Sequence, residues 1–240
     1  MEGPQIIFVI PLFGGIPVTE TIVNSWIIMA AIAILCKFLT HKMQKIPKGR
    51  QVIAEKLVLM VENLVDQTMG KKGRKFAPYI ATLFAFSLLG SLSSLLGMRP
   101  LTADLNTTLG WALVTFFMIQ YYNIRTHGVK GYLKGFVQPM PLLLPMNIIS
   151  EAVNPISMSF RHFGNIAAGV VITSLIYGAL ASASTLLLGW IPNAFIQSIP
   201  ILQLGLPAIL SIYFDLFTSF LQAFIFCMLT MVFVANVMEE

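Results

Sequence analysis

Residues 145–190 read PMNIISEAVNPISMSFRHFGNIAAGVVITSLIYGALASASTLLLGW, a mostly apolar run that contains one arginine. Between Lys134 and Glu239 the only formal charges are Glu151, Arg161 and Asp215. Arginine cannot become neutral by losing its proton, so placing it at the centre of a bilayer costs at least ~2.5–3.5 kcal/mol and usually marks a functional site. Arg161 is therefore the first candidate functional residue.

The composition is that of an integral membrane protein. Hydrophobic residues make up 57% of the chain, charged residues 10%, and the mean hydropathy is +0.82, which no soluble globular composition resembles. A spanning helix takes about 20 residues, so 240 residues have room for a handful of helices. We expect a single membrane domain over residues 1–240, without a separate soluble domain.

The apolar segments predict an all-α fold with about five membrane-embedded helices. The segment 52–69 is amphipathic and predicts a further helix on the cytoplasmic surface. Residues 207–238 alone would span about 48 Å as a helix, against a hydrocarbon core of about 30 Å. We therefore expect the last two helices to be long, strongly tilted and paired as a hairpin. The predicted embedded segments are 21–40, 76–97, 105–123, 146–190 and 199–238.

The net charge of +5 orients the protein and does not indicate nucleic-acid binding. Most basic residues lie within 37–75 and 125–134. The positive-inside rule places both ranges in the cytoplasm. This predicts a multi-pass protein with its N-terminus outside, a basic cytoplasmic loop over 125–140 and a cytoplasmic C-terminus. Neither cysteine has metal or redox spacing, so we expect no metal site and no cofactor.

An acidic stripe on the segment 52–69 has two interpretations. Glu55, Glu62 and Asp66 share one helix face, which could meet a partner. A solvated face is the commoner explanation for such charges.

Polar side chains recur at helical spacing on the last two predicted helices. Asn165 follows Arg161 at i+4 and small residues border this face, which suits close approach by another helix. Asp215, Ser219 and Gln222 share a face of the last helix, where they could hold a file of water and pass small cations. Alternatively, Arg161 pairs with Asp215 as a buried structural salt bridge, which would be weak evidence for stability.

Three motifs resemble subunit a of the bacterial F-type rotary ATP synthases. PISMSFRHFGN at 155–165 is similar to the signature around that family's essential arginine, TADLNTT at 102–108 to its external loop, and LQAFIF at 221–226 to its last-helix motif. The resemblance implies a stator in the inner (plasma) membrane. Its partners would be a rotating ring of c subunits, the b-subunit peripheral stalk, the other synthase subunits and membrane lipid.

The resemblance also implies roles for individual residues. Arg161 would face the ring carboxylates and separate two offset half-channels that carry H⁺ or Na⁺, with no ATP chemistry on this chain. Glu151 would help form the cytoplasmic half-channel. The external half-channel would contain Asp104, Asn106, Asn165, Asp215 and Gln222, with possible contributions from Ser219 and His162.

The chain departs from the family pattern at two positions. Val170 stands nine residues after Arg161, where many relatives carry an acid, so the acidic work of the external path would rest on Asp215. His162 stands where leucine is more usual, and a packed or interfacial histidine is its commoner role. Two other classes stay open at this point: a secondary transporter in which Arg161 binds an anionic substrate, although no inverted repeat is visible, and a structural membrane scaffold.

Overall fold

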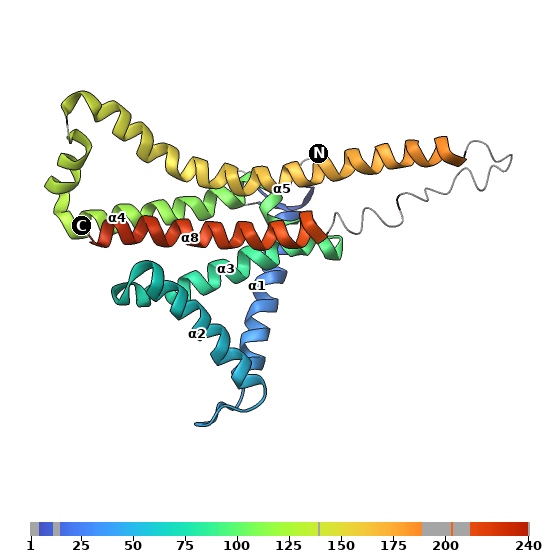
Figure 1. Ribbon diagram of the computed structural model, residues 1–240, viewed down its shortest axis with the longest axis horizontal. Coiled ribbons are helices and arrows are strands. Elements are labelled where there is room, and N and C mark those ends of the chain that lie inside the picture. Colours follow the sequence, from blue (N-terminus) through green and yellow to red (C-terminus); the bar gives the residue numbers. More distant parts are fainter. Residues whose placement is uncertain (1–4, 12–14, 139, 189–202, 204–211, 240) are drawn as a thin grey trace.

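The computed structural model describes residues 5–11, 15–138, 140–188, 203 and 212–239 (Figure 1). Within them the chain is almost entirely helical, as predicted. The strands and helices are β1 (Ile6–Ile10), β2 (Ile16–Thr19), α1 (Glu20–Leu39), α2 (Arg50–Met69), α3 (Ala77–Leu92), α4 (Leu105–Val137), α5 (Leu144–Leu188) and α8 (Thr218–Glu239). Short 3₁₀ turns join several of the helices, and a π-helical turn, η6 (Ile212–Phe217), leads into α8.

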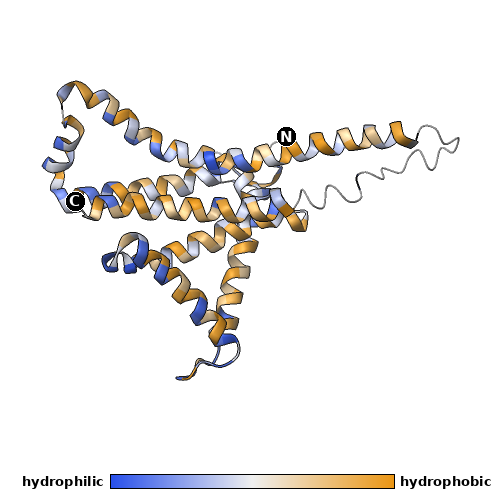
Figure 2. Ribbon diagram, in the orientation of Figure 1, coloured by the Kyte–Doolittle hydropathy of each residue, from blue (hydrophilic) through white to orange (hydrophobic). Residues whose placement is uncertain are grey.

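The candidate membrane-spanning helices are those with long apolar sequences. Four described helical segments are long and apolar enough to cross a membrane: Glu20–Leu39, Lys71–Leu96, Pro141–Leu187 and Asp215–Met238. Figure 2 shows their ribbons mostly in the colours of hydrophobic residues. They correspond to four of the five embedded segments predicted from the sequence. The fifth, 105–123, lies in α4, and its crossing of the membrane stays a prediction.

A two-stranded hairpin precedes α1 and was not foreseen. β1 pairs with β2 antiparallel, and Thr19 lies opposite Ile6. The N–H of Glu20 donates to the carbonyl of Gln5 at 2.9 Å, which ties the start of α1 to the hairpin. Asn24 Nδ2 donates to the carbonyl of Arg99 at 3.1 Å. The N-terminal end of α1 is thus held by polar contacts, while the rest of the helix runs away from the bundle in Figure 1.

The amphipathic helix predicted over 52–69 is α2, and it is only partly covered. Leu57 and Met60 are exposed, whereas Val65 and Met69 are buried in the core. Arg74, on the 3₁₀ turn that follows α2, forms an ion pair with Glu62 at 2.5 Å. One member of the acidic stripe is therefore neutralised within the chain.

The core lies where α3, α4 and α8 meet. Its buried apolar side chains include Ile80, Leu83, Ala112, Ile119, Phe226, Met231 and Val234. Thr115 of α4 and Thr230 of α8 add a buried hydroxyl pair 3.3 Å apart. These three helices form the scaffold on which α5 lies.

The expected loop over 125–140 is instead helical as far as Val137. α4 continues past its apolar part and breaks at Gly128, whose φ of 70° and ψ of 167° are not helical. Glycine adopts this conformation without a Cβ penalty, so the chain can turn there and resume a helix. The predicted loop is thus wrong for most of this segment, and its cytoplasmic position stays a prediction.

α5 is one continuous helix of 45 residues with Pro155 inside it. Its length of about 68 Å is roughly twice the hydrocarbon thickness. In Figure 1, α5 runs beside α4 and α8, and α1 crosses this group steeply. If the shorter α1 stands upright in the bilayer, α5 and α8 must be strongly inclined. The connection between the predicted segments 146–190 and 199–238 lies outside the described residues.

Candidate functional site

Arg161 lies on the exposed side of α5. Among the described residues it has no hydrogen bond or ion pair, and the one salt bridge found there joins Arg74 to Glu62. The proposed structural pair between Arg161 and Asp215 is therefore absent. Only 6% of the residues in the most apolar part of α5 are buried, against 44% for α8. The arginine lies on the least covered of the four candidate spans.

Asp215 lies beside a different part of α5. A small cavity of about 20 Å³, here called the Asp215 cavity, has room for about one water molecule. Gly169 and Val170 border it from α5, eight and nine residues after Arg161, which is about 12–13.5 Å along a helix. Its full lining is Ser91, Ser94, Pro100, Ile166, Gly169, Val170, Asp215 and Ser219.

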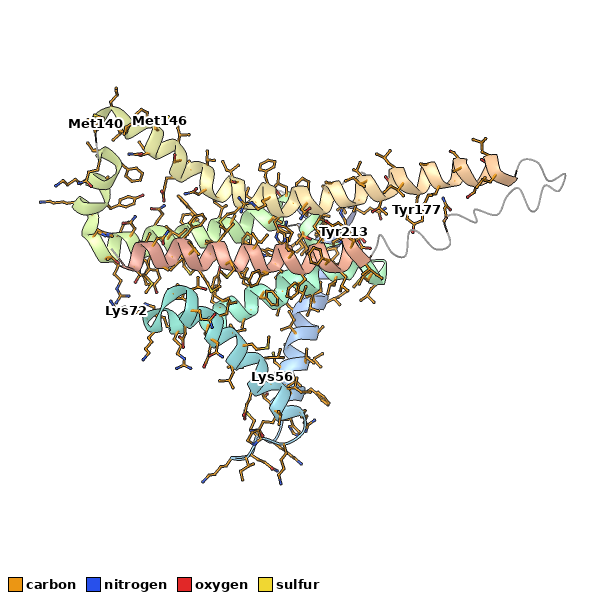
Figure 3. The ribbon with its side chains drawn as sticks, in the orientation of Figure 1. Lys56, Lys72, Met140, Met146, Tyr177 and Tyr213 are labelled. Carbon is orange, nitrogen blue, oxygen red and sulfur yellow. The ribbon has the colours of Figure 1, made fainter. Side chains whose placement is uncertain are left out.

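The π-helical turn η6 sets the position of Asp215. Thr218 Oγ1 donates to the carbonyl of Tyr213, five residues earlier, at 3.0 Å. Figure 3 shows Tyr213 at the start of α8, with Tyr177 farther along α5. Wide turns of this kind occur mostly as single interruptions of α-helices, frequently at functional sites. Here the turn contains Asp215, the one acidic residue of the apolar segment that leads into α8.

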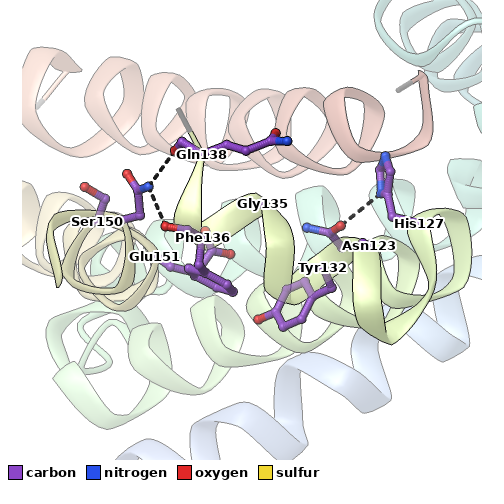
Figure 4. A pocket seen from close by; sticks show the side chains of 10 residues that line it. Asn123, His127, Tyr132, Gly135, Phe136, Gln138, Ser150 and Glu151 are labelled. Carbon is purple, nitrogen blue, oxygen red and sulfur yellow. Dashed lines mark hydrogen bonds between the residues drawn. The ribbon is translucent and has the colours of Figure 1, made fainter. Parts of the chain in front are cut away.

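A larger polar cavity lies near the opposite end of the bundle, where α4 ends and α5 begins (Figure 4). This Glu151 cavity has a volume of about 660 Å³. Gln120 Nε2 donates to Glu151 Oε1 at 2.5 Å. Asn147 Nδ2 donates to the carbonyls of Phe136 at 2.9 Å and Gln138 at 3.1 Å, which fixes the start of α5 against the end of α4.

Two further polar groups lie in the wall of the Glu151 cavity. His127 Nδ1 is 3.0 Å from Asn123 Oδ1. Burial raises the pKa of Tyr132, and the nearby Glu151 carboxylate raises it further. Since the tyrosine stays protonated, its hydroxyl can donate to water or to an anion. The complete lining is Asn123, His127, Gly131, Tyr132, Gly135, Phe136, Gln138, Asn147, Ser150 and Glu151.

Aromatic rings from α4 and α8 surround His162 of α5, between the two cavities. His162 is 1% exposed, and its ring centroid is 5.8 Å from that of Trp111 and 5.6 Å from that of Phe226. Its Nε2 is 3.3 Å from Ser87 Oγ. The histidine is thus a packed one. In Figure 3, Met146 near the Glu151 cavity and Tyr213 near the Asp215 cavity lie well apart along the bundle.

The remaining predicted residues do not all gather at the Asp215 cavity. Asp104 Oδ1 accepts the N–H of Asn106 at 3.0 Å and caps the start of α4, which is a structural role. Asn165 is half-buried on α5, and Gln222 is buried on α8. Of the predicted external set, only Asp215 and Ser219 border this cavity.

The serines of α3 and its following turn, and the glutamine partner of Glu151, were not predicted from the sequence. Ser87, Ser91 and Ser94 interrupt an otherwise apolar span at helical spacing. Hydroxyls at membrane depth need partners, and that signal could have found them. Gln120 could have been found in the same way, because it is an amide near the end of an apolar segment.

The fold and both cavities thus define an all-helical membrane protein with polar chambers on either side of an exposed arginine. The description "ATP synthase A chain" belongs to a family model that matches residues 22–235, and the chain belongs to this family. It is an ion-translocating F0 subunit of ATP synthase, which assembles with other synthase subunits. The transporter and scaffold interpretations are accordingly set aside.

Curated relatives cover nearly the whole chain. ATP synthase subunit a of Moorella thermoacetica is 36% identical over 224 residues, which are 93% of this chain and 92% of the relative. The sodium-ion-specific ATP synthase subunit a of Propionigenium modestum is 32% identical and covers 98% of this chain and 84% of its own length. The subunit a of Geobacter sulfurreducens is 32% identical over 92% of this chain and 88% of its own.

Proposed function

We propose that this chain is the stator that carries ions to and from a rotating ring of c subunits through two offset half-channels. The observation that carries the proposal is the arrangement along α5: an exposed Arg161 with a polar cavity toward each end. Glu151 lies ten residues before the arginine, about 15 Å along the helix, and Gly169 lies eight residues after it, about 12 Å. An ion entering one cavity therefore has no short polar route to the other.

The Glu151 cavity serves as the cytoplasmic half-channel. Its size, its amide and hydroxyl lining, and the basic segment 125–134 beside it support this assignment. The positive-inside rule places that basic segment in the cytoplasm, which also puts the N-terminus outside and the C-terminus inside. The Asp215 cavity then belongs to the external half-channel, with Asp215 as its acid. Asn165 and Gln222 border the same path, and Asp104 with Asn106 lie near its outer entrance.

Arg161 acts as a fixed cation facing the ring. A positive charge nearby favours the ionised form of a carboxylate, so a ring carboxylate that reaches Arg161 releases its ion. The neighbouring Gly164, Ala167 and Ala168 are small, which allows a helix of the ring to approach closely. The exposure of Arg161 on α5 supports this, because a permanent charge that faces the membrane is costly unless a partner pairs with it.

The other partners follow from family membership and are proposed on that basis. They are the b-subunit peripheral stalk and the remaining synthase subunits, with lipid around α1. The coupling ion is H⁺ or Na⁺. A relative described as sodium-ion-specific justifies testing both ions.

The test replaces Arg161 in the assembled synthase. Arg161→Ala is expected to abolish ion-driven ATP synthesis in membrane vesicles while the complex still assembles. Arg74→Ala is the matched control, because Arg74 is an exposed arginine in a surface ion pair, and such pairs contribute little. Full coupled synthesis in the Arg161→Ala vesicles, with either H⁺ or Na⁺, would refute the proposal.

A further inference from the structure

One stripe of side chains on α5 packs against the rest of the protein near Arg161. Its members are Pro155, Met158, Ser159, His162 and Ile166, all buried. Their spacing of three or four residues defines one side of a helix. Arg161 is the residue next to His162, about 100° away around the helix axis. His162, the immediate neighbour of the arginine, is therefore one of the most deeply buried side chains of this stripe.

His162 contacts three helices at once. Its Nε2 reaches Ser87 of α3 at 3.3 Å, and its ring packs edge-on against Trp111 of α4 and Phe226 of α8. Met158 and Ile166 make apolar contacts, which are not directional. A hydrogen bond has a preferred distance and angle, so two contacts of the stripe can specify one rotation of α5. They are the His162–Ser87 contact and the contact of Ser159 Oγ with Thr108 Oγ1 of α4, at 3.1 Å.

A rotation of α5 would have a large effect here. The most apolar part of the helix is sparsely covered, so the buried stripe carries most of the contacts that set its rotation. A turn by one residue position would bring Arg161 toward Trp111 and Phe226, whose rings cannot form an ion pair with it. His162 occupies that position instead, and its polar edge is matched by a serine.

We infer that His162 is a positioning residue, which fixes the rotation of α5 so that Arg161 stays on the ring-facing side. This inference rests on the proposed function, since it assumes that the exposed side of α5 faces the ring. His162 acts through the arginine and does not itself carry the ion.

The experiment compares His162→Gln with His162→Asn in the assembled synthase. The glutamine amide reaches the position of Nε2 and can bond to Ser87, whereas the shorter asparagine amide lies near the position of Nδ1. We expect the glutamine variant to retain most ion-driven ATP synthesis. In the asparagine variant, ion-driven ATP synthesis should fall about tenfold, which is the scale for a buried hydroxyl left without its partner. Thr230→Ala is the control, because it removes a buried hydroxyl pair with Thr115 that does not involve α5.

A second measurement reports the rotation directly. Single cysteines replace Ala168, which is exposed, or Ala167, which is half-buried, and disulfide formation is measured with a cysteine next to the ring carboxylate. Cys36 is exposed and is replaced by serine throughout. With His162 present we expect strong cross-linking at Ala168 and weak cross-linking at Ala167. His162→Asn should reduce this preference, and His162→Gln should keep it.

The outcomes separate the two proposals. Absence of cross-linking at both alanines with His162 present would refute the ring-facing assignment of α5, and with it the proposed function. Normal cross-linking that is equally selective in the asparagine variant, with equal synthesis in both variants, would refute the role of His162 alone. If the asparagine variant does not assemble, His162→Leu keeps the volume without the hydrogen bond, and the same two readouts apply to it.

Discussion

Gly164 offers a way to detect the ring through a change that this chain itself tolerates. It lies three residues after Arg161, and a Cβ built at this position meets no atom within 4 Å. Replacing a helical glycine by leucine should stabilise α5 by up to about 1 kcal/mol, because glycine is the poorer helix former. In the assembled synthase the same side chain would project into the proposed contact with the ring. Forcing extra carbons into a packed contact costs about 1–3 kcal/mol.

The two effects of Gly164→Leu have opposite signs, which makes the prediction sharp. The melting temperature of the isolated subunit in detergent should stay the same or rise. Ion-driven ATP synthesis in vesicles should fall by about 5- to 150-fold, the ratio that corresponds to about 1–3 kcal/mol. Gly110→Leu is the matched control, since Gly110 is exposed on α4 and its Cβ would also meet no atom within 4 Å. Synthesis that is unchanged in the Gly164 variant would show that no partner approaches this face of α5.

Four further substitutions test the two cavities and the break in α4. Asp215→Asn should slow passive ion flux through the membrane sector by about tenfold or more, because the cavity loses its acid. Adding Val170→Glu should restore part of that flux, since Val170 borders the same cavity, and absence of rescue would count against a shared site. Glu151→Gln should lower the flux less severely, because the larger Glu151 cavity keeps its other polar groups; complete loss would contradict a water-filled vestibule. Gly128→Ala should cost about 1–3 kcal/mol of unfolding free energy at a φ of 70°, whereas Gly135→Ala, with no atom within 4 Å of its Cβ, should not destabilise the subunit in the same thermal denaturation assay.

The sequence predicted the helices well where hydropathy and length decide the structure. The segments 21–40, 52–69 and 76–97 correspond closely to described helices, because an apolar or amphipathic run of that length has one stable form in or on a bilayer. The helical segment after Gly128 was missed, because glycine and lysine content indicates a loop and does not show that a helix resumes beyond a break. The β1–β2 hairpin was missed because pairing of two short strands depends on contacts outside each strand.

The sequence indicated which residue types belong to the candidate site, but not how these residues lie relative to one another along the helices. Arg161, Asp215 and Glu151 were visible as charges in an apolar region. Their relative positions depend on how far α8 is shifted along α5, and helical spacing within one helix carries no information about that shift. The structure groups Asp215 with Val170 and not with Arg161. Val170, where many relatives carry an acid, and Asp215 therefore border one small cavity from two helices.

The low coverage of α5 also bears on the order of assembly. Before a ring is present, the Arg161 side of this helix would face lipid, with a guanidinium that cannot be neutralised and costs at least ~2.5–3.5 kcal/mol at membrane depth. That cost is a substantial part of the few kcal/mol by which proteins are commonly stable. We expect the free subunit to be short-lived in the cell and to persist only once a finished ring has covered α5. A membrane sector that closes last at the arginine would also avoid leaking ions while it is being built.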